Sequence, residues 1–130
     1  MATNTRKRDA IKHIRDRAKS AYEKDNKCYI CNSTESLELH HFSSLTNLLE
    51  KWSKLQGYDT STDEAVLAIR DEFIEAHRAQ IYDQVVTLCK KHHLLLHSVY
   101  GGKPALATAE KQQRWVEKQK DKYGDKILGT

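Results

Sequence analysis

Three cysteines and one histidine form two short pairs that could bind a zinc ion. Cys28 and Cys31 are separated by two residues, and Cys89 and His92 have the same spacing. Four such donors can close a tetrahedron around zinc and leave no open position, which is the arrangement of a structural site. The odd number of cysteines argues against disulfide pairing, and the second pair disfavours the alternative of free or redox thiols. We therefore predict a structural Zn²⁺ on these four residues.

Four further histidines have the spacing expected of a catalytic metal site. His93 and His97 are four residues apart, so they project from one face of a helix and can bind one ion. His40 lies on a short predicted strand that could supply a third nitrogen, and three ligands leave positions open for water and a phosphate oxygen. Strand alternation points His41 away from His40, which leaves His41 free to act as a general base. For each histidine taken alone, packing or surface hydrogen bonding is the alternative.

The elements that would position these residues follow from the hydrophobic pattern. Apolar residues at helical spacing predict helices over residues 6–25, 45–56, from about 61 onward, 90–98 and about 107–123. Short apolar and β-branched runs predict strands at Leu37–His40 and Gln84–Leu88. Gly57 suits the end of the second helix, and Ser61 with Glu64 has capping-box spacing for the start of the third.

Charge is distributed unevenly along a chain whose net charge is +4. Residues 1–27 contain nine basic and four acidic residues, and residues 84–130 contain the same numbers. Residues 59–83 contain two basic and seven acidic residues. Basic ends suit contact with phosphate groups and an acidic middle does not, although a solvated helix surface is the alternative for a basic helix.

The segments around both ligand groups resemble the signature of HNH nucleases. The chain has Cys-x-x-Cys, then LELHHF, and later QVVTLCKKHHLLLH. Members of that family have a Cys-x-x-Cys knuckle, a strand ending in Asp-His or His-His, and a Leu-Cys-x-x-Cys-His segment followed by another histidine. The matching segments, roughly 28–42 and 84–97, cover under a quarter of the chain and contain nearly all of the motif.

The resemblance implies an α+β fold, in which a small and mostly helical domain surrounds a zinc-stabilised ββα-metal core of a short β-hairpin and a helix. It implies that His40, His93 and His97 bind a catalytic divalent metal (Mg²⁺, Mn²⁺, Ni²⁺ or Zn²⁺) and that His41 is the general base. Gln84 occupies the place of the middle asparagine, which usually braces the loop that carries the base.

We expect a single nuclease domain over residues 1–130. A basic N-terminal helix would occupy residues 1–26, the ββα-metal core residues 27–98, and a basic C-terminal helix residues 104–130. The core would contain an acidic helical insert at 45–83, where HNH nucleases usually have a short loop. The inner faces of this insert would be formed by Leu45, Leu48, Leu49, Trp52, Leu55, Ala65, Ile69 and Phe73.

The function that the resemblance implies is metal-dependent hydrolysis of phosphodiester bonds in DNA, by a phage-encoded or homing-type endonuclease that leaves 5′-phosphate and 3′-hydroxyl ends. The alternative is a non-catalytic zinc module that binds DNA or protein. Double-stranded DNA would be contacted by basic residues, namely Arg6, Lys7, Arg8, Lys12, Arg15, Lys90, Lys91, Lys111 and Arg114. The acidic insert would enlarge the core away from DNA, or dock a second copy or a basic partner. The first residues lack an apolar signal segment, so we expect a cytoplasmic protein.

Overall fold

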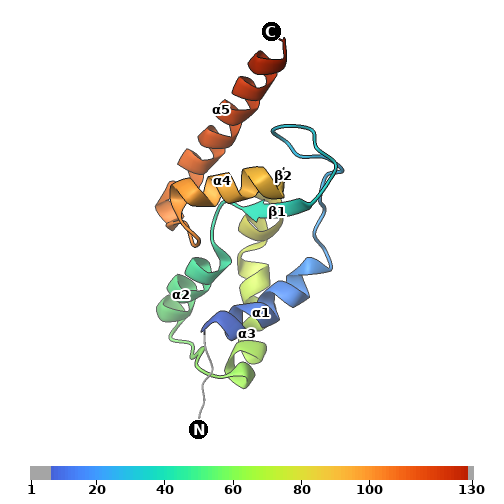
Figure 1. The fold of residues 1–130 in the computed structure, drawn as a ribbon. Coiled ribbons are helices and arrows are strands. Elements are labelled where there is room, and N and C mark those ends of the chain that lie inside the picture. The colour runs from blue at the N-terminus through green and yellow to red at the C-terminus, as the bar shows by residue number, and fades with distance from the viewer. Residues whose placement is uncertain (1–6, 129–130) are drawn as a thin grey trace.

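A two-stranded antiparallel sheet lies at the centre of the fold and separates two groups of helices (Figure 1). The structure, a computed structural model, describes residues 7–128 and the side chains of residues 11–124. On one side of the sheet lie α1 (Lys7–Lys19), α2 (Leu45–Gln56) and α3 (Asp63–Ala76), and on the other α4 (Lys90–Tyr100) and α5 (Ala109–Leu128). The mostly helical α+β fold with a β-hairpin is therefore confirmed.

The register of the sheet determines which way its histidines point. Strand β1 (Leu37–His41) pairs with β2 (Val85–Cys89), so that Leu37 lies opposite Cys89 and His41 opposite Val85. Side chains alternate along a strand, so Glu38 and His40 share one face of the sheet and His41 occupies the other. The two adjacent histidines are thus directed to opposite sides of the hairpin.

Each side of the sheet has its own hydrophobic core. The first core joins α1, α2 and α3, and its buried residues include Ile14, Leu48, Val66 and Phe73. The second joins the sheet, α4, α5 and the segment around Cys28. The predicted helical insert is therefore packed against α1 and is not a floppy loop.

Helix ends in the insert agree with the sequence in part. Helix α2 ends at Gly57 as predicted, where a φ of 73° favours glycine. Helix α3 begins after Thr62 and not at Ser61, because the hydroxyl of Thr62 accepts the backbone N–H of Ala65 at 3.1 Å. Two predicted inner-face positions are wrong: Leu55 is 75% exposed in the last turn of α2, and Val66 is buried in place of the half-buried Ala65.

The helices at the two ends of the chain differ in length from the prediction. Helix α1 ends at Lys19, because the chain turns there and packs Tyr22 against Tyr82 and His41. Helix α4 continues to Tyr100, and α5 starts at Ala109, after a 3₁₀ turn, and continues to Leu128. Within residues 7–128, no helix has both the length and the apolar character required to span a bilayer.

Candidate metal centres and active site

Cys28, Cys31, Cys89 and His92 form one candidate metal site, with their ligand atoms all within 4.8 Å of one another. The turn that follows Cys28 brings the first pair together, and its residue Asn32 has a φ of 62°. Strand β2 passes directly into α4 at Cys89, which places His92 one turn further on. The Sγ atoms of Cys31 and Cys89 are 3.8 Å apart, and Cys89 Sγ lies 3.3 Å from His92 Nδ1. Two sulfurs in a tetrahedral zinc site are also about 3.8 Å apart, so the donors fit such an ion.

The surroundings of the sulfurs also suit a cation. Burial acts to raise the pKa of Cys28, but hydrogen bonds from backbone amides of Cys31, Cys89 and Ile30 lower it below its usual value. Burial and the neighbouring Cys28 and Cys89 sulfurs raise the pKa of Cys31 to about 11. The three sulfurs cannot all be thiolates at such short distances unless a positive charge compensates them, and a bound metal ion supplies that charge.

His40, His93 and His97 form the second candidate metal site. His40 Nδ1 lies 3.1 Å from His93 Nε2, which lies 3.0 Å from His97 Nε2. Nitrogen ligands at about 2.0–2.1 Å from a metal are about 3 Å apart when they occupy neighbouring coordination positions. The three inner nitrogens therefore have a spacing that fits a single ion.

The outer nitrogens of the same three rings all face hydrogen-bond acceptors. His93 Nδ1 lies 2.7 Å from a carboxylate oxygen of Glu38, and His97 Nδ1 lies 2.7 Å from the carbonyl oxygen of Gly101. His40 Nε2 lies 2.8 Å from the amide oxygen of Gln112. An acceptor requires an N–H from the ring, so in the neutral form each inner nitrogen carries a lone pair.

Lone pairs that face one another at about 3 Å repel, and a cation between them removes the repulsion. Burial lowers the pKa of His40 to about 3, although its hydrogen bond to Gln112 acts in the opposite direction. His40 is therefore neutral and could bind a metal ion without competing with it as a cation. An outer N–H held by a carboxylate or a carbonyl oxygen is the usual environment of a histidine that ligates a metal.

His41 faces the opposite side of the hairpin, where its Nε2 lies 3.0 Å from the carbonyl oxygen of Ile81. Ile81 is in the π-helical turn η1 (Ala79–Asp83), which precedes β2. The carbonyl can only accept, so Nε2 donates and Nδ1 carries the lone pair of the neutral ring. Burial lowers the pKa of His41, the bond to Ile81 opposes this, and the nearby Arg15 adds to the lowering.

One pocket contains both His41 and the three-histidine cluster. Its wall also includes Arg15 and Lys19 from α1, Tyr22, and Lys103 from the segment after α4. The ring of Tyr22 lies 5.2 Å from that of His41, centroid to centroid. A basic group, a metal-ligand cluster and cationic side chains are therefore gathered in one place, which suits a negatively charged substrate.

The structure does not place the side chain of Gln84, the residue predicted to brace the base, next to the His41 ring. The side chain of Gln84 is exposed and lines a different pocket, with Asp25, Tyr29 and Gln113. Its carbonyl oxygen accepts the backbone N–H of Phe42 at 3.3 Å, next to His41. The brace on His41 is the backbone of Ile81 instead, because the π-helical turn points that carbonyl at the ring.

The structure distributes the predicted DNA-contacting residues over three helices. Of these residues, Arg15 lines the pocket beside His41. The others with described side chains are exposed on α1, α4 and α5, and they are Lys12, Lys90, Lys91, Lys111 and Arg114. Arg6 lies outside the described residues, as do the side chains of Lys7 and Arg8.

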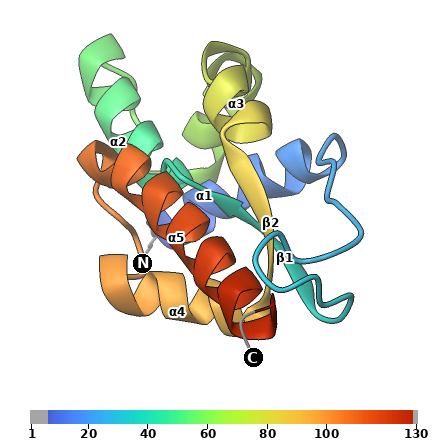
Figure 2. The ribbon, with the colours of Figure 1, turned by 90° about the horizontal axis from the view of Figure 1, so that it is seen from above.

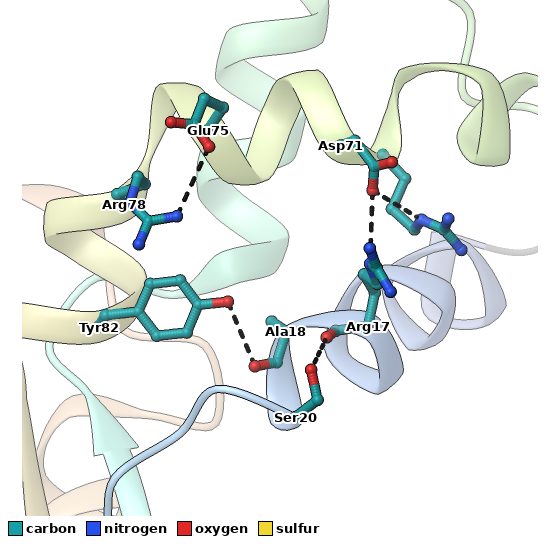
Figure 3. A network of polar contacts seen from close by, with 8 residues as sticks. Arg17, Ala18, Ser20, Asp71, Glu75, Arg78 and Tyr82 are labelled. Carbon is teal, nitrogen blue, oxygen red and sulfur yellow. Dashed lines mark hydrogen bonds and ion pairs between the residues drawn. The ribbon is translucent and has the colours of Figure 1, made fainter.

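The acidic helix α3 contacts the basic helix α1 directly. The guanidinium of Arg17 lies 3.7 Å from Asp71, and the hydroxyl of Tyr82 donates to the carbonyl oxygen of Ala18 at the end of α1 (Figure 3). His13 lies 3.3 Å from Asp63 at the beginning of α3. The acidic insert therefore has basic contacts within the chain.

The sequence analysis did not single out four groups of this site, namely Glu38, Lys19, Gln112 and the Ile81 carbonyl. Glu38 could have been, because it precedes His40 by two residues on a strand and so shares its face. Lys19 follows Arg15 by about one helical turn, and this spacing predicts that the two residues share one face of the helix. Gln112 and the Ile81 carbonyl have no such signal, since their positions depend on how α5 and η1 pack.

A comparison with protein families gives a match over nearly the whole chain. Residues 1–128 match the model of the phage T5 nicking endonuclease family. No solved structure matches this chain.

Proposed function

We propose that this chain, which belongs to the phage T5 nicking endonuclease family, is a metal-dependent HNH-type nuclease with His41 as its general base. Nicking endonucleases act on DNA, so DNA is the substrate and the reaction is hydrolysis of a phosphodiester bond. The geometry around the three-histidine cluster is the observation that carries the proposal. His93 Nε2 lies 3.1 Å from His40 Nδ1 and 3.0 Å from His97 Nε2, each outer nitrogen faces an acceptor, and a fourth histidine, His41, lines the same pocket.

His41 would begin the reaction by taking a proton from water at Nδ1. The hydrogen bond from Nε2 to the Ile81 carbonyl holds the ring in the required tautomer and stabilises the positive charge that the ring gains. The water oxygen then attacks phosphorus in line with the leaving 3′ oxygen, and the bond from phosphorus to that oxygen breaks. Solvent water protonates the 3′ oxygen, so the products are a 5′-phosphate and a 3′-hydroxyl end. A divalent cation held by His40, His93 and His97 would supply Lewis-acid stabilisation of the charge on the phosphate oxygens.

Arg15 and Lys19 would hold the phosphate backbone at this pocket. They are four residues apart on α1, so they project from the same helix face, and both line the pocket that contains His41. Lys103 lines it as well. Contacts of this kind fix the position of the strand and carry no sequence information.

Cys28, Cys31, Cys89 and His92 would bind a structural Zn²⁺. Three thiolates and one imidazole are the donors that zinc prefers, and four protein ligands leave no position for substrate. The site connects the segment before β1 to the junction of β2 and α4, and so stabilises the hairpin that carries His40 and His41.

Single-strand cleavage is consistent with this geometry. The described residues contain one cluster of three histidines and one adjacent base, and one such centre hydrolyses one phosphodiester bond for each binding event. We propose a phage-encoded nicking enzyme in place of the broader alternative of a homing endonuclease.

A supercoiled plasmid tests the proposal. The protein, treated with a mild chelator and then supplied with Mg²⁺, Mn²⁺ or Ni²⁺, should convert supercoiled DNA to the open-circular form. His93→Ala should abolish nicking while zinc content and circular dichroism stay as in the parent. His13→Ala is the matched control, because His13 pairs with Asp63 between α1 and α3. Undiminished nicking by His93→Ala would contradict the proposal, and DNA binding without cleavage under every metal would favour a non-catalytic module.

A further inference from the structure

We infer that Gln112 of α5 is a positioning residue that fixes the tautomer of His40 and so makes the three-histidine cluster competent to bind metal. The inference rests on the proposed function, since it concerns the same site. It assigns to the C-terminal helix a part in the active centre, in addition to any contact with DNA.

Gln112 is a polar side chain in a fully buried position. It has 0% exposure and lies in the first turns of α5, next to the hydrophobic core formed with the sheet and α4. Figure 1 shows α5 on the same side of the sheet as α4, Figure 2 shows it running obliquely to α4, and Val116 of α5 belongs to the core that contains Leu88 and Leu96. A buried amide destabilises the fold unless its hydrogen-bonding groups are satisfied. The hydrogen-bond partners of Gln112 therefore indicate its role.

The orientation of the Gln112 amide follows from its partners. Its Nε2 lies 3.1 Å from the carbonyl oxygen of Phe42 and 2.9 Å from the hydroxyl of Thr108. A backbone carbonyl can only accept, so the NH₂ group must face Phe42. The amide oxygen is then directed to His40 Nε2, 2.8 Å away.

The orientation of the amide in turn determines the state of His40. An amide oxygen can only accept, so His40 Nε2 must carry the hydrogen and Nδ1 must carry the lone pair. Nδ1 is the nitrogen that lies 3.1 Å from His93 Nε2. In the other tautomer a hydrogen on Nδ1 would project into the position that a metal ion would occupy, and the ring could not be a ligand.

Gln112 differs from the other two residues that hold the outer nitrogens. Glu38 and Gly101 belong to the hairpin and to the end of α4, which are the same elements that carry the ligands. Gln112 comes from a separate helix, 72 residues from His40 in the sequence. The signature segments 28–42 and 84–97 would therefore not form a competent metal centre by themselves.

Three variants separate this role from a purely structural one. Gln112→Met keeps a side chain of similar length but removes the acceptor. Gln112→Glu, with its carboxyl group protonated, keeps an acceptor for His40 Nε2–H and an O–H donor for the Phe42 carbonyl in nearly the same shape. Gln113→Met makes the same chemical change one position along α5, at an exposed residue, and is the matched control. Each would be studied with its four-ligand site loaded with zinc.

Two measurements that do not depend on DNA cleavage decide the outcome. The first is ¹⁵N NMR of the histidine rings before metal is added to the cluster, and we expect His40 of the parent to be the Nε2–H tautomer. The second is calorimetric titration with Ni²⁺. We expect Gln112→Met to weaken Ni²⁺ binding by about 10–100-fold, the usual effect of removing such a partner. Gln112→Glu should bind near the parent value, and Gln113→Met should be unchanged.

Three results would overturn the inference. They are an Nδ1–H tautomer of His40 in the parent, undiminished Ni²⁺ affinity in Gln112→Met, and a loss of Ni²⁺ affinity in Gln112→Glu as large as that in Gln112→Met. If Gln112→Met does not fold, the tautomer of His40 in the parent and the Ni²⁺ affinity of Gln112→Glu relative to the parent still test the inference. A protein whose Ni²⁺ binding depends on Gln112 but which fails to nick DNA would refute the proposed function and leave this inference standing.

Discussion

Replacing His41 with alanine removes the nitrogen that we propose takes the proton from water, and it leaves the metal ligands in place. His41 points away from His40 across the hairpin, and its ring contacts are with Tyr22 and the Ile81 carbonyl. The change should therefore affect the chemical step more than metal binding. Loss of a general base lowers a rate by about 10²–10⁴-fold, which raises the activation free energy by about 3–5 kcal/mol.

The cost to stability should be smaller than this effect on rate. The substitution leaves the Ile81 carbonyl without the imidazole N–H, and an unsatisfied buried acceptor costs about 1–3 kcal/mol. Because His41 lines an open pocket, water can reach that carbonyl and reduce the cost. We expect His41→Ala to remain folded, with parental zinc content.

Single-turnover nicking of a plasmid, with enzyme in excess and metal saturating, measures the rate of the chemical step. DNA affinity and Ni²⁺ affinity, measured on the same samples, should stay near the parent values. Nicking by His41→Ala at more than a tenth of the parent rate would remove His41 from the role of base. A rate loss matched by an equal loss of metal affinity would show that His41 acts on the cluster and not on water.

Three other predictions concern different parts of the chain. Cys89→Ala should lose the tightly held zinc, as measured by elemental analysis, and with it the cooperative unfolding transition, because metal binding and folding are coupled; a folded, metal-free variant would contradict the structural role. Arg15→Ala should weaken DNA binding and reduce the slope of log affinity against log salt concentration by about 1, and an unchanged slope would exclude a phosphate contact. Phe73→Ala, which empties a fully buried site beside Trp52, should cost about 3–5 kcal/mol in urea unfolding, whereas the exposed Leu55→Ala should cost less than about 0.5 kcal/mol.

Short-range spacing made the ligand groups predictable from the sequence. Residues three or four positions apart on a helix share a face whatever the rest of the fold does, so His93 and His97 had to meet. The opposite directions of His40 and His41 follow in the same way from strand alternation, and the register of the hairpin agrees with it. The end of the helix Leu45–Gln56 was also predictable, because it depends on a local signal, the glycine at position 57.

The parts that could not be predicted depend on contacts between distant segments. Gln112 reaches His40 only because of the way α5 packs on the second core, and the hydrophobic periodicity of α5 does not predict that contact. The motif position of Gln84 predicts a brace at that residue, whereas the contact to the His41 ring comes from the backbone carbonyl of Ile81 in the preceding π-helical turn. A side-chain pattern cannot predict a contact made by a backbone group. Leu55 fits the helical stripe, but it lies in the last turn of α2, where 75% of its surface is exposed.

The packing of α1 gives its two polar faces different surroundings. Successive residues on a helix are rotated by about 100°, so positions two apart lie on nearly opposite faces. His13 and Arg17 pair with Asp63 and Asp71 of the acidic insert, whereas Arg15 and Lys19 lie in the pocket with His41.

The insert therefore pairs Arg17 with a carboxylate on one face of α1 and leaves the other face basic. Exposed ion pairs of this kind contribute little stability each, so their main effect is on where the positive potential lies. The basic face that remains is the one beside the candidate active site. An acidic insert is then compatible with a DNA substrate, because like-charge repulsion would keep the phosphate backbone away from α3 and leave the basic face of α1, beside the candidate active site, to contact it.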